Sequence, residues 1–209
     1  MPLDPEPKTD GLGRPYPTVE PRDPWAGEYE LARAALDNQE PGAIETLESL
    51  ADQGSILSML FIADELRIGG WVYVQDFRCA KLWYQEAIGA GSIRALYGLG
   101  LGHLHSGEPE QALLLLRLAA EHGYAPAIGA LGSLHFKGQQ VEKNKAEALK
   151  LWRRAAALGH VNSEMVLTSR QLHGHFGLVG MLEGLRNLVP VAFKHARLRA
   201  EDPYSDRLA

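Results

Sequence analysis

Five histidines come nearest to a chemical motif in this 209-residue chain. His103 and His105 form an HLH motif, His173 and His175 form an HGH motif, and His135 lies between them. Neutral imidazole is a common zinc ligand, so these side chains could serve a small metal-dependent hydrolase. The sequence has no HExxH or CxxC motif and no carboxylate-rich cluster to complete such a site. We therefore expect structural or hydrogen-bonding roles for the histidines, with the metal-dependent hydrolase as the alternative.

The motifs of other common enzymes are also absent. There is no GxSxG, no phosphate-binding GxxxxGK[ST] and no dinucleotide-binding glycine motif that opens on a strand. The segment GLGLG, residues 98–102, resembles a glycine-rich loop, but it lies in phase with ALGSL, residues 130–134, inside a helical pattern. Close packing between helices explains these glycines better than a phosphate site does. We predict that the chain is not an enzyme and binds no cofactor or metal.

Composition narrows the range of partners. The formal net charge is −5, which gives no basic surface for nucleic acid. No run of about 18 apolar residues exists, so no segment is expected to span a membrane. Cys79 is the single cysteine, which fits a reducing compartment, and the first residues lack the features of a secretory signal. We therefore expect a cytoplasmic protein.

Any functional site in this chain must be held in place by helices, and four glycines mark where these predicted helices end. Gly54, Gly91, Gly123 and Gly159 each close an alanine-rich helical phrase, at spacings of 37, 32 and 36 residues. Small or aliphatic residues recur at fixed distances from these glycines. Eleven residues before them stand Ala43, Ala80, Ala112 and Ala148; four after them stand Ser58, Ala95, Ala127 and Ser163; eight after them stand Ile62, Leu99, Leu131 and Leu167.

This register predicts helix pairs that stack on one another. Glycine ends a helix without steric cost, small residues let helices approach closely, and one pair cannot bury its apolar face alone. The predicted fold is all-α, a right-handed αα-superhelix of about four helix-pair repeats. The repeats occupy residues 26–175. Residues 1–25, with seven of the twelve prolines, form a disordered leader, and residues 176–209 form a helical cap and tail.

The register resembles the Sel-1-like repeat family, relatives of the tetratricopeptide repeat. The family pattern falls on Leu131, Gly132, Gly138, Ala148 and Gly159 in one repeat, and on Ile62, Gly69, Asp76, Ala80 and Gly91 in another. His103 and His135 replace the family's tyrosine. The resemblance implies a protein-interaction module, an adaptor, scaffold or regulatory subunit without chemistry of its own.

The resemblance also implies where a partner binds. In tetratricopeptide repeats the first helix of each pair lines a concave groove, which captures a peptide or helix. The corresponding positions in this chain, called the groove positions below, are expected to contact a protein or peptide partner. They include Leu57, Leu60, Arg67, Arg94, Tyr97, Leu101, Leu104, Phe136, Met165 and Leu172. The chain's own termini filling the groove are the alternative occupant, and the sequence does not give the oligomeric state.

A stripe of apolar residues marks the segment after the repeats. Leu178, Leu182, Leu185 and Val189 lie on one helical face, and Pro190 is expected to break or kink the helix. We expect this stripe to cover the last repeat, because the end of a solenoid needs a cap. A membrane-binding amphipathic helix and a partner-docking helix are the alternatives.

Overall fold

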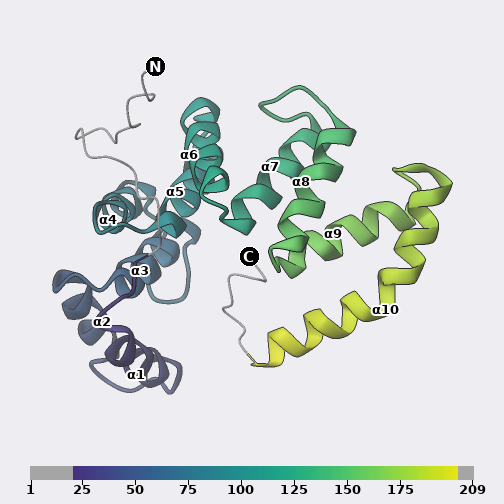
Figure 1. Cartoon of the computed structure of the whole chain (residues 1–209). Helices are drawn as coiled ribbons and strands as arrows, with labels where there is room; N and C mark the ends of the chain where they lie inside the picture. Colours follow the sequence, from purple (N-terminus) through teal and green to yellow (C-terminus); the bar gives the residue numbers. More distant parts are fainter. Residues whose placement is uncertain (1–20, 202–209) are drawn as a thin grey trace, which may run out of the picture. The chain divides into compact units, whose positions relative to one another are not determined.

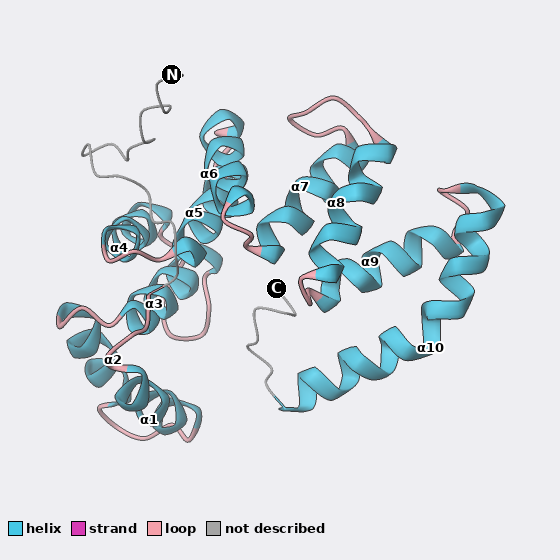
Figure 2. Cartoon of the chain, viewed as in Figure 1, coloured by secondary structure: helices cyan, strands magenta, loops and turns pink. Residues whose placement is uncertain are grey.

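A computed structural model describes residues 21–201, and all structural statements below concern this range. The described chain consists of ten α-helices with loops between them and contains no strand (Figure 2). The helices are α1 (Ala26–Asp37), α2 (Ala43–Asp52), α3 (Ile56–Ile68), α4 (Phe77–Gly89), α5 (Ile93–His105), α6 (Pro109–Glu121), α7 (Ala125–Lys137), α8 (Lys145–Ala157), α9 (Val161–Leu172) and α10 (Gly177–Glu201). The predicted all-α class is confirmed.

Contacts between residues divide the chain into two compact units. The amino-terminal unit comprises residues 1–112 and the carboxy-terminal unit residues 113–209, so the boundary falls inside α6. In the amino-terminal unit α3 packs against both α4 and α5. In the carboxy-terminal unit α7 packs against both α8 and α9. Each unit therefore repeats one arrangement, in which a first helix contacts its own second helix and the next first helix.

The four closing glycines end the second helices as predicted. Gly54, Gly91, Gly123 and Gly159 each follow the last residue of a helix by two positions and have φ between 80° and 102°. Only glycine adopts this left-handed conformation without strain. The turn after each glycine starts the next helix, and Ser55 and Ser92 cap α3 and α5 with their side-chain oxygens.

The small and aliphatic positions of the register form the core. The residues eleven before, four after and eight after each closing glycine are all buried. The position seven residues before each glycine is buried as well, but its side chain varies widely in size. It is occupied by Leu47, Tyr84, Leu116 and Trp152. This position holds the main anchor of each second helix.

Two of these anchors fit against glycines of first helices. The ring of Tyr84 in α4 occupies the space that a Cβ atom on Gly98 of α5 would need. A Cβ atom on Gly132 of α7 would lie 2.9 Å from the indole of Trp152 in α8. Trp152 also donates its indole N–H to the carbonyl of Gly129, at 3.2 Å. The structure thus confirms that Gly98 and Gly102 of GLGLG and Gly132 of ALGSL serve close helix packing.

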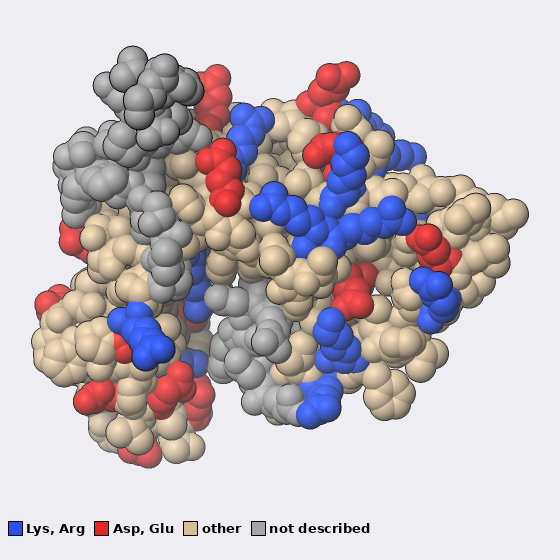
Figure 3. All heavy atoms as spheres, in the orientation of Figure 1, with Lys and Arg blue, Asp and Glu red and all other residues tan. Residues whose placement is uncertain are grey.

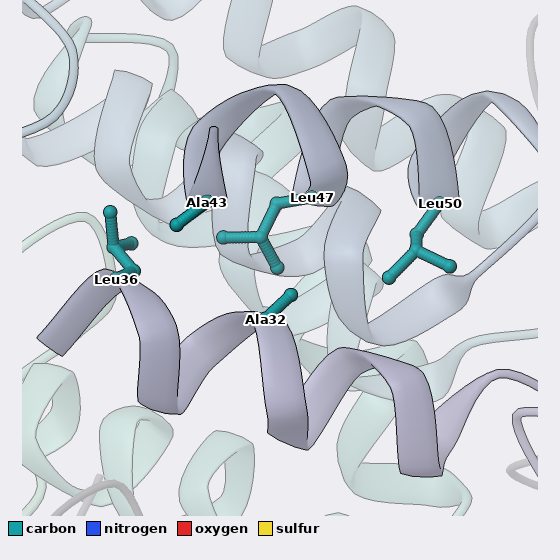
Figure 4. Packing of buried hydrophobic residues seen from close by; sticks show 5 residues of the cluster. All are labelled: Ala32, Leu36, Ala43, Leu47 and Leu50. Carbon is teal, nitrogen blue, oxygen red and sulfur yellow. The ribbon is translucent and has the colours of Figure 1, made fainter. Parts of the chain in front are cut away.

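The first helix pair forms its own small core. Ala32 and Leu36 of α1 pack against Ala43, Leu47 and Leu50 of α2 (Figure 4). Trp25 and Tyr29 are partly buried against this cluster. The first repeat therefore folds as a helix pair with a core of its own.

The last helix differs from its prediction. α10 packs on α9 through a face that holds Gly180, Gly184 and Val191. The predicted capping stripe lies elsewhere, since the exposed fractions of Leu178, Leu182, Leu185 and Val189 range from 56% to 68%. The expectation that this stripe covers the last repeat is therefore wrong.

Glycines explain the packing of α10. A Cβ atom on Gly184 would lie 3.0 Å from both the backbone nitrogen of Leu172 and the Cβ atom of Gln171. The small face therefore allows α10 to approach α9 more closely than the leucine face would. α10 continues through Pro190, and Figure 1 shows a bend partway along this helix. Proline inside a helix is an ordinary cause of such a bend, because it removes one backbone hydrogen bond.

The predictions for the ends of the chain fall mostly outside the described residues. These predictions are the disordered leader, residues 1–25, and the tail that follows the cap. Residues 1–20 and 202–209 are not described. Asp23, near the described start, accepts hydrogen bonds from the Ser55 hydroxyl at 3.0 Å and from the Leu57 backbone at 2.7 Å. The chain therefore enters the first repeat along the start of α3.

Candidate protein-interaction site

The groove positions of the amino-terminal unit lie on two helices that contact each other. α3 carries Leu57, Leu60 and Arg67, and α5 carries Arg94, Tyr97, Leu101 and Leu104. Leu60 is only 2% exposed and belongs to the core. The other six side chains are half-buried, which leaves part of each accessible. The two helices thus bring a mixed apolar and basic set of side chains to one part of this unit.

The groove positions of the carboxy-terminal unit centre on an aromatic side chain. Phe136 of α7 lies in contact with Trp152, Phe176 and His175, at ring-centroid distances of 5.3, 6.4 and 5.2 Å. The Arg170 guanidinium lies 4.9 Å from the centroid of Phe136. Met165 and Leu172 lie on α9, which packs on α7, and both are half-buried. Phe136 is therefore held in place by neighbours on α8, α9 and the loop that precedes α10.

Asp64 is the centre of a polar cluster among the groove positions of the amino-terminal unit. Its Oδ1 atom accepts a hydrogen bond from the Tyr84 hydroxyl at 2.6 Å and lies 3.2 Å from Arg67 Nη2. Its Oδ2 atom lies 3.4 Å from Arg94 Nη2. Arg67 also donates from Nε to the Tyr84 oxygen, at 3.0 Å. One carboxylate thus joins the first helices of two successive repeats to a second helix.

Burial and neighbouring charges shift the pKa values of Tyr84 and Arg67 in this cluster. Burial raises the pKa of the Tyr84 phenol, and the Asp64 carboxylate raises it further. Burial alone would lower the pKa of Arg67, but Tyr84 and Asp64 outweigh that effect and the net pKa is raised. The phenol therefore stays protonated and the guanidinium stays charged at neutral pH. The arrangement is built to hold positions rather than to exchange protons.

Two side chains of α1, Arg33 and Tyr29, lie near the same first helices. The Arg33 guanidinium of α1 lies 4.5 Å from the ring centroid of Phe61 in α3. Burial raises the pKa of Tyr29 of α1, and the charges of Arg33, Arg94 and Asp64 also act on this phenol. α1 therefore reaches the neighbourhood of the Asp64 cluster and supplies an aromatic side chain to it.

The histidines have separate environments. His103 is buried, with Nδ1 2.7 Å from Glu108 Oε2 and its ring packed edge-on against Phe77. His135 Nδ1 lies 3.4 Å from the Glu142 carbonyl oxygen, and His173 Nδ1 lies 2.7 Å from the Ser169 carbonyl oxygen. In residues 21–201 no group of three His, Cys, Asp or Glu side chains could hold a metal ion. The hydrolase alternative has no supporting geometry in this part of the chain.

Tyr84 was not among the residues predicted from the sequence to form the site. Arg67 and Arg94 were predicted only as groove positions, with no contact between them. The signal for Tyr84 was the buried position seven residues before the closing glycine, which Trp152 also occupies. The hydroxyl on that buried ring required a polar partner, and Asp64 supplies it.

The stacked helix pairs and their register define a helix-pair repeat protein of the α-solenoid class. The Sel1 repeat family matches residues 93–124 and 125–160. These two segments of the chain therefore match the Sel1 repeat that the register resembles, and Sel1 repeats generally mediate protein–protein interactions. No curated protein matches the sequence significantly.

Solved structures agree on the fold. A Sel1 repeat protein from Oxalobacter formigenes shares 22% identity, with 81% of this chain and 79% of that chain covered and a TM-score of 0.60. A protective antigen present in uropathogenic Escherichia coli strains, displaying an SLR fold, shares 24% identity with a TM-score of 0.55. That match covers 70% of this chain, and this chain spans a third of the antigen's length (33%). These similarities establish the fold alone.

The described helices include no candidate for crossing a bilayer: none is both long enough and apolar enough.

Proposed function

We propose that this chain is an adaptor or regulatory subunit that binds an amphipathic segment of a partner protein on α3 and α5. The observation that carries the proposal is the Asp64 cluster, which fixes two successive first helices through Arg67 and Arg94. The four other accessible groove positions, Leu57, Tyr97, Leu101 and Leu104, stay half-buried beside it. A surface that is rigid before binding loses little conformational entropy when a partner docks. The single cysteine suits a cytoplasmic site of action.

Tyr97 is the proposed anchor of this surface. It lies on α5 between Arg94 and Leu101, and its half-buried ring offers a large, rigid contact area with one polar atom. Leu101 and Leu104 extend the apolar part along the same helix. The arginines contribute differently. Arg67 and Arg94 already contact the Asp64 carboxylate, so an acidic group of a partner competes with Asp64 for them.

The test begins with a pull-down from the native host, followed by titration calorimetry with the purified partner. We expect Tyr97→Ala to weaken binding by about 2 kcal/mol, roughly thirtyfold, because a few central anchors carry most binding energy. Leu82→Ala is the matched control, since Leu82 is a 62% exposed apolar side chain on the second helix α4. Circular dichroism melts of both variants check that the fold is intact.

Two results of the titrations would contradict the proposal. Loss of binding in Leu82→Ala with full affinity in Tyr97→Ala places the partner on the second helices and contradicts the proposal. A partner that binds both variants as tightly as the native chain also contradicts it, because neither surface then carries the interaction.

A further inference from the structure

The longest helix presents an apolar face that no other described helix covers. The exposed residues Leu178, Leu182, Leu185 and Val189 follow one another at spacings of four, three and four, and Phe193, four residues further, is 76% exposed. This spacing places Leu178, Leu182, Leu185 and Val189, which precede Pro190, on one side of α10, opposite the face that packs on α9, and Phe193 lies just beyond the bend. Isolated exposed leucines are ordinary, but a continuous stripe of this length indicates a surface that docks on something.

Arginines flank the apolar stripe. Arg186 lies between Leu185 and Val189 in the sequence of the stripe, and Arg197 and Arg199 follow the bend near the end of α10. Lys194 extends away from the stripe to Glu164 of α9, at 2.8 Å. An apolar face edged by arginine is the composition of helices that lie in a membrane interface.

The carboxy-terminal unit as a whole carries a net positive charge, as do the arginines beside the stripe. The carboxy-terminal unit contains 13 Lys and Arg against 8 Asp and Glu, a net charge of +5, whereas the amino-terminal unit contains 8 against 18, a net charge of −10. The two values add to the −5 of the chain. In the view of Figure 3, Lys and Arg side chains gather over the carboxy-terminal unit. The unit that carries α10 is therefore attracted to anionic surfaces.

We propose that α10 docks this protein on an anionic lipid surface, with its apolar stripe among the acyl chains and its arginines at the headgroups. A second copy of the chain fits this face less well. In an antiparallel two-fold pair of α10 helices each flank meets the same flank of the other copy, so arginine would meet arginine. Anionic lipid complements the flanks and covers the stripe together.

The first experiment is flotation of the full chain with vesicles of phosphatidylcholine, with and without about one third phosphatidylglycerol. We expect binding to the anionic vesicles only, weakened by added salt. Leu182→Ser with Leu185→Ser removes apolar area from the stripe and should lower partitioning at least about tenfold. Leu158→Ser is the control, because Leu158 is 53% exposed but lies outside α10.

A charge series separates attraction by α10 from attraction by the unit as a whole. Arg186→Gln with Arg199→Gln removes two charges beside the stripe and should weaken binding more than tenfold, since each basic residue near the surface contributes about fivefold. Arg117→Gln with Lys137→Gln removes two exposed charges from α6 and α7 and should have a smaller effect. Circular dichroism confirms that all variants remain folded.

Three outcomes overturn the proposal. One is no flotation with anionic vesicles at low salt. Another is equal binding by the α10 variants and their controls. The third is a concentration-dependent dimer, seen by light scattering and abolished by Leu182→Ser with Leu185→Ser, in the absence of vesicle binding; a second copy then occupies the stripe. Binding of Tyr97→Ala to vesicles at native strength shows that the lipid surface is separate from the proposed partner surface.

Discussion

The Tyr84 hydroxyl donates a 2.6 Å hydrogen bond to Asp64, and this contact ties a second helix of one repeat to the first helix of the same repeat. The same carboxylate reaches Arg94 in the next repeat. Two repeats are therefore joined by polar contacts in addition to apolar packing. The Tyr84 hydroxyl oxygen meets both partners at one place: it donates to Asp64 and accepts a hydrogen bond from Arg67.

Removing that hydroxyl should destabilise the fold measurably. Tyr84→Phe keeps the ring but leaves Arg67 and Asp64 without one of their hydrogen-bond partners, and we expect a loss of about 1–3 kcal/mol in the free energy of unfolding. Urea denaturation followed by circular dichroism measures it. Tyr73→Phe is the control, because the Tyr73 hydroxyl bonds Glu48 at 2.7 Å in an exposed setting and its loss should cost under about 0.5 kcal/mol. Equal losses in the two variants would contradict the buried role of Tyr84.

Alkaline pH should weaken the fold through the same phenol. The pKa of Tyr84 is raised in the folded state, so above pH ~10 the unfolded chain releases this proton while the folded chain keeps it. The stabilisation is complete below the unfolded pKa and is lost as pH rises toward the folded pKa. We expect Tyr84→Phe to reduce the slope of unfolding free energy against pH between about 10 and 11.5 by up to ~1.4 kcal/mol per pH unit. Identical slopes for the two proteins would refute this assignment.

A methyl group at Gly98 should collide with the Tyr84 ring. The hydrogen bonds of Tyr84 hold that ring in place, so Gly98→Ala overpacks the contact between α4 and α5 and should cost about 1–3 kcal/mol. Gly27→Ala is the matched control, since a Cβ atom on Gly27 of α1 has no neighbour within 4 Å and alanine favours helix. Thermal melts should show a lower midpoint for the first variant and an unchanged or higher midpoint for the second. A stabilised Gly98→Ala would mean that the ring moves freely.

Truncation of two tryptophans should change the free energy of unfolding by very different amounts. Trp152 is buried beside Gly132 and bonded to Gly129, so Trp152→Ala should cost about 3–5 kcal/mol. Trp71 is 64% exposed in the loop before α4, and Trp71→Ala should change stability by less than about 0.5 kcal/mol. Chemical denaturation of both variants tests the difference. A mild effect of Trp152→Ala would show that this position is not the anchor of α8.

The repeat register could be predicted from the sequence, because small residues and closing glycines recur at fixed spacing and each of these positions has one packing role. The sequence did not reveal the Asp64 cluster, because three helices must be placed before Tyr84 and Arg94 are seen to converge on one carboxylate. The face of α10 was also assigned wrongly. The apolar pattern predicted that the leucine stripe would pack on α9. The opposite face packs there instead, because Gly180 and Gly184 allow the two helices to approach closely.

The anchor seven residues before each closing glycine limits how this chain can be rearranged. Tyr84 fits the glycine of the following first helix, Gly98, whereas Trp152 fits the glycine of its own first helix, Gly132. Duplicating or exchanging whole repeats would therefore keep Trp152 with its glycine but separate Tyr84 from Gly98; a duplicated α3–α4 pair would set the Tyr84 phenol against Phe61, which occupies the position of Gly98. The exchangeable module in this protein is an aromatic ring together with its glycine, wherever the repeat boundary is drawn.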